Sequence, residues 1–313
     1  GDVVTATVTM SEAVVVSGAP QLALNIGGTT VQGTYDSVNS STTALKFNYT
    51  ILASQTDANG ISIAANSLGL NSRTIVDTAG NVATITHSLV ADNSSYKVDT
   101  TAPAAPTVNT ATADDVINAT ERTNGVTITG TTESGSTVTV NGNAATVTGT
   151  TWSYTFSAAA IDALTILNSS TGSTELTVIA TDAAGNTTTT KAWPKIDTAA
   201  PSAPTITSVT DDLAPTTGTL ISGGFTNDTT PTIRVSLTST NAVAGDSVQL
   251  YNGTTVLGTA TILTSTNITN GYIDITTSTL SQGAYTLDAK VIDIAGNVSS
   301  ASSGFTTTVD TSI

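Results

Sequence analysis

The sequence contains no cysteine and only one histidine, His87, among its 313 residues. A disulfide framework and a thiolate metal site are therefore excluded, and so is a zinc site that needs two imidazole ligands. His87 stands in a polar, strand-like stretch without an obvious partner, so we expect it to be exposed. Glu133 and Glu175 do not indicate a catalytic pair, because Glu175 begins a strand. No glycine-rich phosphate loop leads from a strand into a helix, and we expect that the protein is not an enzyme.

Basic residues are scarce as well. Eight Lys and Arg stand against 23 Asp and Glu, which gives a net charge of -15. Such a surface repels nucleic-acid backbones and anionic membranes. No apolar run approaches the roughly 20 residues that span a bilayer, so neither nucleic-acid binding nor membrane insertion is expected. Only 10% of the residues are charged, against roughly 25% in an average domain, so the positions of the carboxylates are informative.

What the sequence does contain is internal repetition. The segment Val98–Thr107 (VDTTAPAAPT) recurs as Ile196–Thr205 (IDTAAPSAPT), and Val309-Asp310-Thr311 begins a further copy. A second motif, Asp-x-Ala-Gly-Asn, precedes each of these segments and occurs at Asp77–Asn81, Asp182–Asn186 and Asp293–Asn297. Two motifs that recur in the same order predict three tandem modules, at residues 1–100, 101–198 and 199–313.

Each module has the pattern of a small all-β domain. Apolar and polar residues alternate in stretches such as 3–9, 126–129 and 137–140, and β-branched residues dominate them. Asn141-Gly142 and Asn252-Gly253 are typical of hairpin turns. Residues 158–164 are the one helical candidate. About 100 residues with many short strands predict an immunoglobulin-like β-sandwich for each module.

The modules are expected to follow one another in an extended rod. Pro103, Pro106, Pro201 and Pro204 favour extended backbone in the linkers, which predicts stiff spacers. The first residues of module 1 already match a second strand, so its first strand is expected to precede residue 1.

The order of strands in such a sandwich predicts where the acidic residues lie. The loop between the last two strands and the loop between the second and third strands both lie at the end where the linker enters. In module 2, strand F is predicted at 174–181 and strand B at 126–131. Asp182 and Asn186 then lie in one loop and Glu133 in the other, beside Asp99 of the linker.

Carboxylates that converge in this way repel one another, by up to roughly 4 kcal/mol for two unit charges about 4 Å apart at an effective dielectric constant near 20. A bound cation removes that cost. Ca²⁺ suits such a site because it accepts about 6 to 8 oxygen ligands in flexible geometry, and no softer ligand set is present. The alternative is that Asp and Asn only stabilise turns through hydrogen bonds to their own backbone.

The same reasoning yields the remaining candidate calcium ligands. Module 1 contributes Glu12, Asp77 and Asn81, and the junction of modules 2 and 3 contributes Asp197, Asp293 and Asn297, with Asp246 from a neighbouring loop. Asp57-Ala58-Asn59-Gly60 is similar to part of a calcium loop and is expected near Asp99. Further candidates are Asp310 of the last linker copy and two pairs, Asp114-Asp115 and Asp211-Asp212, which form either a second ion site or a solvated loop.

The two linked motifs resemble the tandem bacterial Ig-like domains of giant repeats-in-toxin and biofilm-associated adhesins of Gram-negative bacteria. Module 1 resembles one subtype, through Ser11–Val14 (SEAV) and Thr56–Ile61 (TDANGI), and modules 2 and 3 resemble another. Gln55 and Ala192-Trp193-Pro194 depart from the pattern. The resemblance implies type I secretion, display on the cell surface and calcium that stiffens the repeats.

These observations favour a calcium-stiffened spacer that holds the binding region of an adhesin away from the cell. Its expected partners are calcium ions and neighbouring repeats of the same chain, with host or surface glycans or proteins bound through other parts, and it is expected to be a monomer. The alternative is a glycan- or protein-binding module, with module 1 the first choice. Trp152 and Tyr154 on one strand, with Trp193 near a junction, are interpreted as core residues rather than a binding platform. Strand propensity explains the abundant threonine more simply than an ice-binding array does.

Overall fold

The computed structural model describes residues 1–168 and 172–312, and almost all regular structure in it is β-strand. The described chain divides into two compact units. The first comprises Gly1–Pro106, Thr132–Val138 and Ile179–Thr189, and the second comprises Thr107–Thr131, Thr139–Val178 and Thr190–Ile313. The predicted boundaries at residues 100 and 198 stay a prediction. No helix in the described ranges is long and apolar enough to cross a membrane.

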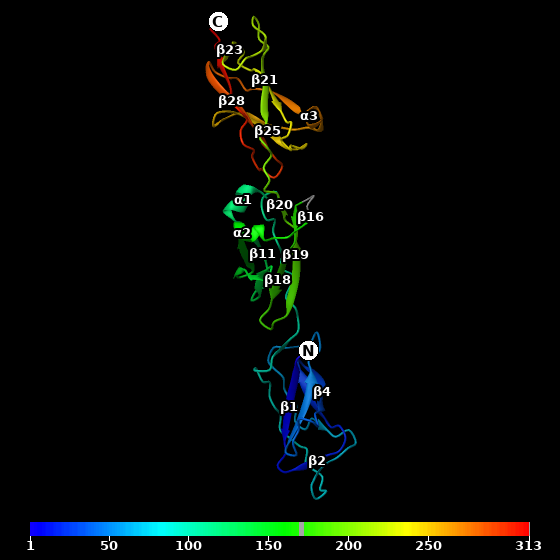
Figure 1. The fold of residues 1–313 in the computed structure, drawn as a ribbon. Helices are drawn as coiled ribbons and strands as arrows, with labels where there is room; N and C mark the ends of the chain where they lie inside the picture. Colours follow the sequence, from blue (N-terminus) through cyan, green and yellow to red (C-terminus); the bar gives the residue numbers. More distant parts are fainter. Residues whose placement is uncertain (169–171, 313) are drawn as a thin grey trace. The chain divides into compact units, whose positions relative to one another are not determined.

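Residues 1–106 of the first unit form a five-stranded antiparallel sheet (Figure 1). Its order is β1 (Val3–Thr9), β5 (Ala44–Thr50), β4 (Thr29–Tyr35), β3 (Gln21–Ile26) and β7 (Leu68–Gly69). Two separate two-stranded sheets accompany it: β2 (Val14–Val16) with β8 (Ile75–Asp77), and β6 (Thr56–Asp57) with β9 (Val98–Asp99). Alternate residues of β3 and β5 are buried, so Leu22, Leu24, Leu45 and Phe47 form the centre of one hydrophobic core.

The middle of the chain contains several short strands and two helices. The strands are β10 (Val116–Ile117), β11 (Val126–Thr131), β12 (Thr137–Val140), β13 (Asn143–Ala144), β14 (Thr146–Thr148), β15 (Thr151–Phe156), β16 (Ile166–Asn168), β17 (Ser173–Thr174), β18 (Leu176–Thr181), β19 (Thr187–Ala192) and β20 (Lys195–Ile196). Their sheets have the orders β11-β15-β14, β13-β12-β18-β19 and β10-β20-β17-β16. The hairpin at Asn141-Gly142 is confirmed, since both residues have positive φ and Val140 pairs with Asn143.

The helical prediction was only partly right. Helix α2 (Ala158–Asp162) lies where it was expected, but α1 (Ala119–Asn124) and α3 (Ser265–Asn270) were not predicted. Both missed helices begin with a capping box, formed by Asn118 with Glu121 and by Thr264 with Asn267. This short-range signal is present in the sequence, but the helices are too short and too polar to show an apolar period.

The last part of the chain, within the second unit, consists of two sheets. One has the order β22 (Gly218–Thr219), β21 (Thr205–Asp211), β24 (Thr232–Ser236) and β27 (Tyr272–Thr276). The other has the order β23 (Gly224–Thr226), β29 (Phe305–Val309), β28 (Gly283–Ile292), β25 (Ser247–Asn252) and β26 (Thr255–Ile262). Val209, Ile233 and Val235 of the first sheet share one core with Val248 and Leu287 of the second, which makes this part a β-sandwich.

The hairpin turn predicted at Asn252-Gly253 lies one residue later in the chain. Asn252 pairs with Thr255 and belongs to β25, so the turn is Gly253-Thr254. Of the predicted dipeptide only Gly253 has positive φ, at 59°. A two-residue turn with glycine in its first position explains the shift.

Candidate metal sites

The three Asp-x-Ala-Gly-Asn loops have the same internal hydrogen bonds. In each, the first residue's main-chain N–H donates to the carbonyl of the last. The asparagine returns two bonds to the aspartate, from its main-chain N–H to Oδ1 and from Nδ2 to Oδ2. The Nδ2–Oδ2 distances are 2.7 Å for Asn81–Asp77, 2.8 Å for Asn186–Asp182 and 2.9 Å for Asn297–Asp293. The glycine before each asparagine has φ between 85° and 93°, a conformation that side chains disfavour.

These bonds stabilise the ionised form of the loop aspartate. The amide of Asn81 is the largest cause that lowers the pKa of Asp77, and Asn186 has the same effect on the pKa of Asp182, with main-chain N–H groups adding to both. The ionised forms of Asp77 and Asp182 are therefore favoured by contacts within their own loops.

Predicted calcium ligands line three surface hollows. The first is lined by Glu12, Asp77 and Asn81 and has a volume of about 170 Å³. Glu12 and Asn81 are exposed, and Asp77 is half-buried. The strand pair β2–β8 brings the three residues together, because Val14 lies opposite Asp77.

The second hollow, of about 560 Å³, is lined by Asp99 and Thr100 on one side and by Gly185 and Asn186 on the other, with Asp2 also in its lining. Asn186 Nδ2 donates a hydrogen bond of 3.2 Å to the main-chain oxygen of Asp99. Glu133 contacts the same linker, since its Oε2 accepts the N–H of Ala104 at 2.9 Å. The linker and both predicted loops thus meet in the first compact unit. Asp2 was not among the predicted residues.

The third hollow, of about 320 Å³, is lined by Asp197, Asp246 and Asp293. Asp246 is buried, and its carboxylate accepts the N–H groups of Val243, at 2.8 Å, and of Ile294, at 3.1 Å. Asn297 Nδ2 donates to the main-chain oxygen of Asp197 at 2.9 Å. Here three carboxylates from distant parts of the sequence face one space.

The linker aspartates themselves have one feature in common. Oδ1 of Asp99, Asp197 and Asp310 each accepts the N–H of the residue two positions later, at 2.9, 3.2 and 3.0 Å. Each therefore forms a turn of its own at the start of the linker. The second oxygen of Asp99 and of Asp197 accepts no hydrogen bond from the residues that the structure describes.

The chemistry of these linings fits a hard cation, although the carboxylates are not gathered around one point. Within residues 1–168 and 172–312, no three carboxylate, imidazole or thiolate groups are arranged to hold a metal ion. Two buried hydroxyl groups beside Glu133, Thr132 Oγ1 and Ser136 Oγ, have no hydrogen-bond partner in the described part of the chain. Buried polar atoms without a partner are rare and point to a bound water or ion. Carboxylate, amide, hydroxyl and carbonyl oxygens are the donors that Ca²⁺ accepts.

The loop at Asp57 has a structural role in the described contacts. Asp57 is buried, and its oxygens accept the N–H groups of Gly27 and Gly60, both at 2.8 Å. Asn59 instead bonds Asp92. The pairing of Thr56 with Asp99 brings this loop beside the linker, where the sequence analysis expected it.

A comparison with protein-family models finds a match to the bacterial Ig-like domain over residues 203–311. The two packed sheets described above occupy the same residues. This part of the chain, called the bacterial Ig-like domain below, is similar to that family. The resemblance drawn from the motifs is thereby confirmed for the last third of the sequence.

The chain is also similar to several solved structures. One is of a Ca²⁺-stabilized adhesin that helps an Antarctic bacterium reach out and bind ice, with 24% identity, 98% of this chain and 69% of that chain covered, and a TM-score of 0.41. A second is of a 1.5-MDa bacterial ice-binding adhesin, with 20% identity, coverage of 99% and 92%, and a TM-score of 0.37. A third is a bacterial immunoglobulin-like domain from the M. primoryensis ice-binding adhesin, with 29% identity, coverage of 31% and 100%, and a TM-score of 0.23. No curated protein matches the chain.

The bacterial Ig-like domain contains a further acidic cluster around β23. Asp211 and Asp228 are both buried, and Thr226 joins them: its hydroxyl donates to Asp211 at 2.6 Å and accepts the N–H of Asp228 at 3.0 Å. The N–H of Asp310 donates to the Thr226 carbonyl, and that of Asp212 to Asp228 at 3.5 Å. Asp228 was not predicted, because only its position beside Thr226 links it to the others.

The pair Asp114-Asp115, which corresponds to Asp211-Asp212 in the sequence analysis, closes a turn. Oδ1 of Asp114 accepts the Thr112 hydroxyl and the N–H of Val116, and these bonds, the hydroxyl first, lower its pKa. Asp115 has φ of 60° and accepts the N–H of Ala111 at 3.0 Å.

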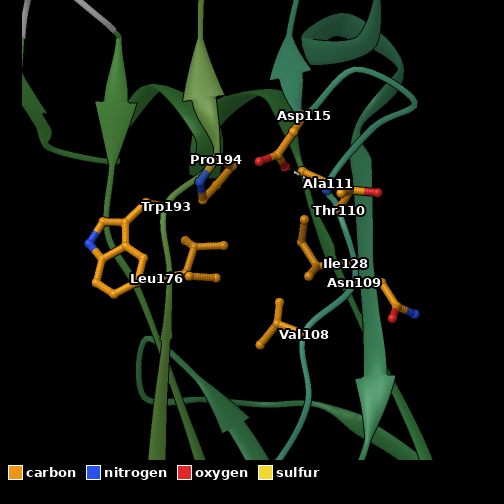
Figure 2. A pocket seen from close by; sticks show the side chains of 10 residues that line it. Val108, Asn109, Thr110, Ala111, Asp115, Ile128, Leu176, Trp193 and Pro194 are labelled. Carbon is orange, nitrogen blue, oxygen red and sulfur yellow. Dashed lines mark hydrogen bonds between the residues drawn. The ribbon is translucent and has the colours of Figure 1, made fainter.

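A small cleft of about 120 Å³ lies beside Asp115, and Figure 2 shows the side chains of Val108, Ile128 and Leu176 around it, with Pro194 nearby. Trp193 lines it and is 55% exposed, so it is not a core residue. Trp152 is buried, as predicted, and its Nε1 donates to the Thr107 carbonyl.

His87 is half-buried rather than exposed, because its Nε2 accepts the N–H of Ser67 at 2.9 Å.

Proposed function

We propose that the chain is a spacer segment of a large bacterial surface adhesin, built from three tandem Ig-like modules and stiffened by Ca²⁺ at their junctions. One observation carries the proposal: a linker aspartate and an Asp-x-Ala-Gly-Asn loop line the same hollow in two places, with Asp99 and Asn186 in one and Asp197 and Asp293 in the other. A spacer of this kind acts outside the cell and needs no catalytic group. Type I secretion, a role in biofilms and a monomeric state belong to the same proposal.

The calcium ligands differ in what each side chain contributes. The free carboxylate oxygens of Asp99 and Asp197 supply negative charge from the linker side. Asp182 and Asp293 supply it from the loop side, and Glu133 and Asp246 from the neighbouring loop. Glu12 and Asp77 would do the same at the first hollow. A divalent cation between such groups replaces repulsion by attraction on both sides, so it resists opening of the junction.

Calorimetric titration of the intact chain with Ca²⁺ tests the proposed ligands. We expect Asp197→Asn to weaken binding at one site by about tenfold or more, because a carboxylate ligand is lost. Asp162→Asn removes an exposed carboxylate that pairs with Arg122 away from the hollows and should leave every site unchanged. Equal effects of the two substitutions, or no calcium binding by the unaltered chain, would contradict the proposal.

Small-angle scattering tests the mechanical role. Removal of Ca²⁺ by a chelator should leave the sandwiches folded, as judged by circular dichroism, while the maximum dimension of the molecule decreases. An unchanged maximum dimension would mean that calcium does not stiffen the junctions.

A second candidate function is ligand binding by the first module. It is supported by a cleft of about 140 Å³ that is lined by Val4, Ile63, Val90 and Tyr96, of which Tyr96 is 55% exposed. An exposed aromatic ring beside an apolar cleft is a common recognition surface for glycans and peptides. Retention of the chain on a glycan array, lost in Tyr96→Ala, would favour this function over a pure spacer.

A further inference from the structure

We propose that the asparagine of the Asp-x-Ala-Gly-Asn loop is a metal-independent lock, which holds the linker by hydrogen bonds when no cation is bound. We call this contact the amide lock: the bonds from Asn186 to the Asp99 linker, and from Asn297 to the Asp197 linker. The inference goes beyond the proposed function, because it assigns to the asparagine a role that persists in the absence of calcium.

The amide lock occurs twice with the same atoms. Asn186 Nδ2 donates to the main-chain oxygen of Asp99 at 3.2 Å, and Asn297 Nδ2 donates to that of Asp197 at 2.9 Å. The partners are 87 and 100 residues apart in the sequence. Recurrence of one contact between the same two motifs indicates that it is a property of the motifs and not of one loop.

Hydrogen-bond chemistry requires an amide at this position. The side-chain nitrogen has two hydrogens. In both loops one bonds Oδ2 of the loop aspartate and the other bonds the linker carbonyl. Both partners are pure acceptors, so only the NH₂ group of the amide can face them, and this fixes its orientation. An aspartate in its place would set a carboxylate against two acceptors.

The second lock is more extensive than the first. Asn297 is 4% exposed, and its Oδ1 also accepts the N–H of Ala119, the first residue of α1, at 2.8 Å. Both N–H donors and the oxygen of its amide are thus used in a buried setting, where an unmade bond is costly. Asn186 is half-buried and, among the residues that the structure describes, makes only the linker bond beyond its own loop. We therefore expect the lock at Asn297 to be the stronger of the two.

The first loop provides a matched control within the same chain. Asn81 makes the same bonds to Asp77 at similar distances but is exposed and contacts no linker residue in the described ranges. A substitution there removes the loop contact without removing a lock.

The test uses the intact chain in excess EDTA, with two spin labels. The natural absence of cysteine allows labels at Thr150→Cys and Thr254→Cys, two exposed positions. Electron–electron distance measurements should give a narrow distribution for the otherwise unaltered chain. Asn297→Asp should raise the population of the unlocked arrangement about tenfold, as expected when hydrogen bonds in a buried site are lost, and Asn81→Asp should leave the distribution unchanged.

Hydrogen exchange of the Ala119 N–H gives an independent readout, because this donor bonds Asn297 Oδ1 directly. In EDTA we expect it to be protected in the unaltered chain and to exchange about tenfold faster in Asn297→Ala, which removes the acceptor. A broad distance distribution and an unprotected Ala119 N–H in the unaltered chain would overturn the inference even if no variant folds. Failure of calcium binding would overturn the proposed function alone, since both measurements are made without calcium.

Discussion

Two aspartates of the bacterial Ig-like domain show how far the surroundings decide the behaviour of a single side chain. Asp274 lies beside Arg234, with two hydrogen bonds of 2.7 Å, and this guanidinium lowers its pKa. Asp288 is 7% exposed and its Oδ1 has no hydrogen-bond partner among the described residues. Burial raises the pKa of Asp288, and the nearby ammonium group of Lys290 offsets only part of that effect. The first carboxylate is thus stabilised as an anion and the second is not.

We expect Asp288→Asn to stabilise the protein at pH 7 by about 1 kcal/mol, because it removes a buried charge without changing the shape of the side chain. A raised pKa in the folded state means that stability falls as the pH rises from the ordinary aspartate value through the folded value. The gain should therefore disappear below about pH 3.8. Thermal unfolding at pH 7 and pH 3.5 measures both effects.

Asp274→Asn is the control for that experiment. It removes an exposed ion pair and should cost less than about 1 kcal/mol at pH 7. Stabilisation by both substitutions would mean that the general negative charge, and not the burial of Asp288, is responsible.

Among the elements, helix α1 depends on its first residues more than on packing. None of its residues is buried. Its start is held by Asn118, whose side chain accepts the N–H groups of Thr120 and Glu121, while Glu121 returns a bond to the N–H of Asn118. Gly125 ends it with φ of 80°. A helix of this length is not stable alone. The capping bonds therefore provide stabilisation that a buried apolar face provides in other helices.

We expect Asn118→Ala to destabilise the second compact unit by about 1 kcal/mol, the usual cost of a lost N-cap. Asn118→Ser retains an acceptor at the same position and should be nearly neutral. Chemical denaturation of the two variants checks the difference. Equal loss in both would indicate that Asn118 acts through some contact other than the cap.

For the whole molecule, the excess of negative charge sets how stability responds to pH and to calcium. At a net charge of -15 and a pI of about 4.1, protons and divalent cations relieve the same repulsion. The loop aspartates Asp77 and Asp182 have lowered pKa values, so their stabilising contribution is present above the ordinary value of 3.8 and is lost as the pH falls below it.

We therefore predict opposite pH profiles with and without calcium. In EDTA the melting temperature should rise as the pH falls from 7 toward about 4, because repulsion decreases, and it should fall at lower pH. With calcium near 100 times its dissociation constant, the chain at pH 7 should be more stable by about 2.7 kcal/mol per bound ion. That gain should decrease with falling pH, because protons compete for the ligands. If the melting temperature changed with pH in the same way in EDTA and in calcium, the idea that calcium relieves the repulsion would be contradicted.

The features that the sequence predicted well are those whose contacts are local or repeated. The Asp-x-Ala-Gly-Asn loops close through bonds between residues four positions apart or fewer, and the alternation in β3 and β5 marks their buried faces. The hairpin at Asn141-Gly142 follows from two residues that accept positive φ. The missed helices also have a local signal, their capping boxes, but no apolar period accompanies it.

The sequence by itself determined the repeated motifs, the all-β class and the similarity of the last third of the chain to bacterial Ig-like domains, because these depend on residue types and on spacing along the backbone. Only the tertiary structure decided which oxygens face a common space. Asp246 meets Ile294, and Asn297 meets Asp197 and Ala119, through contacts between segments 48 to 178 residues apart. It also brought Asp2 and Asp228 beside the predicted residues. Such neighbours depend on how sheets pack and where loops end, and the spacing within a single motif predicts neither.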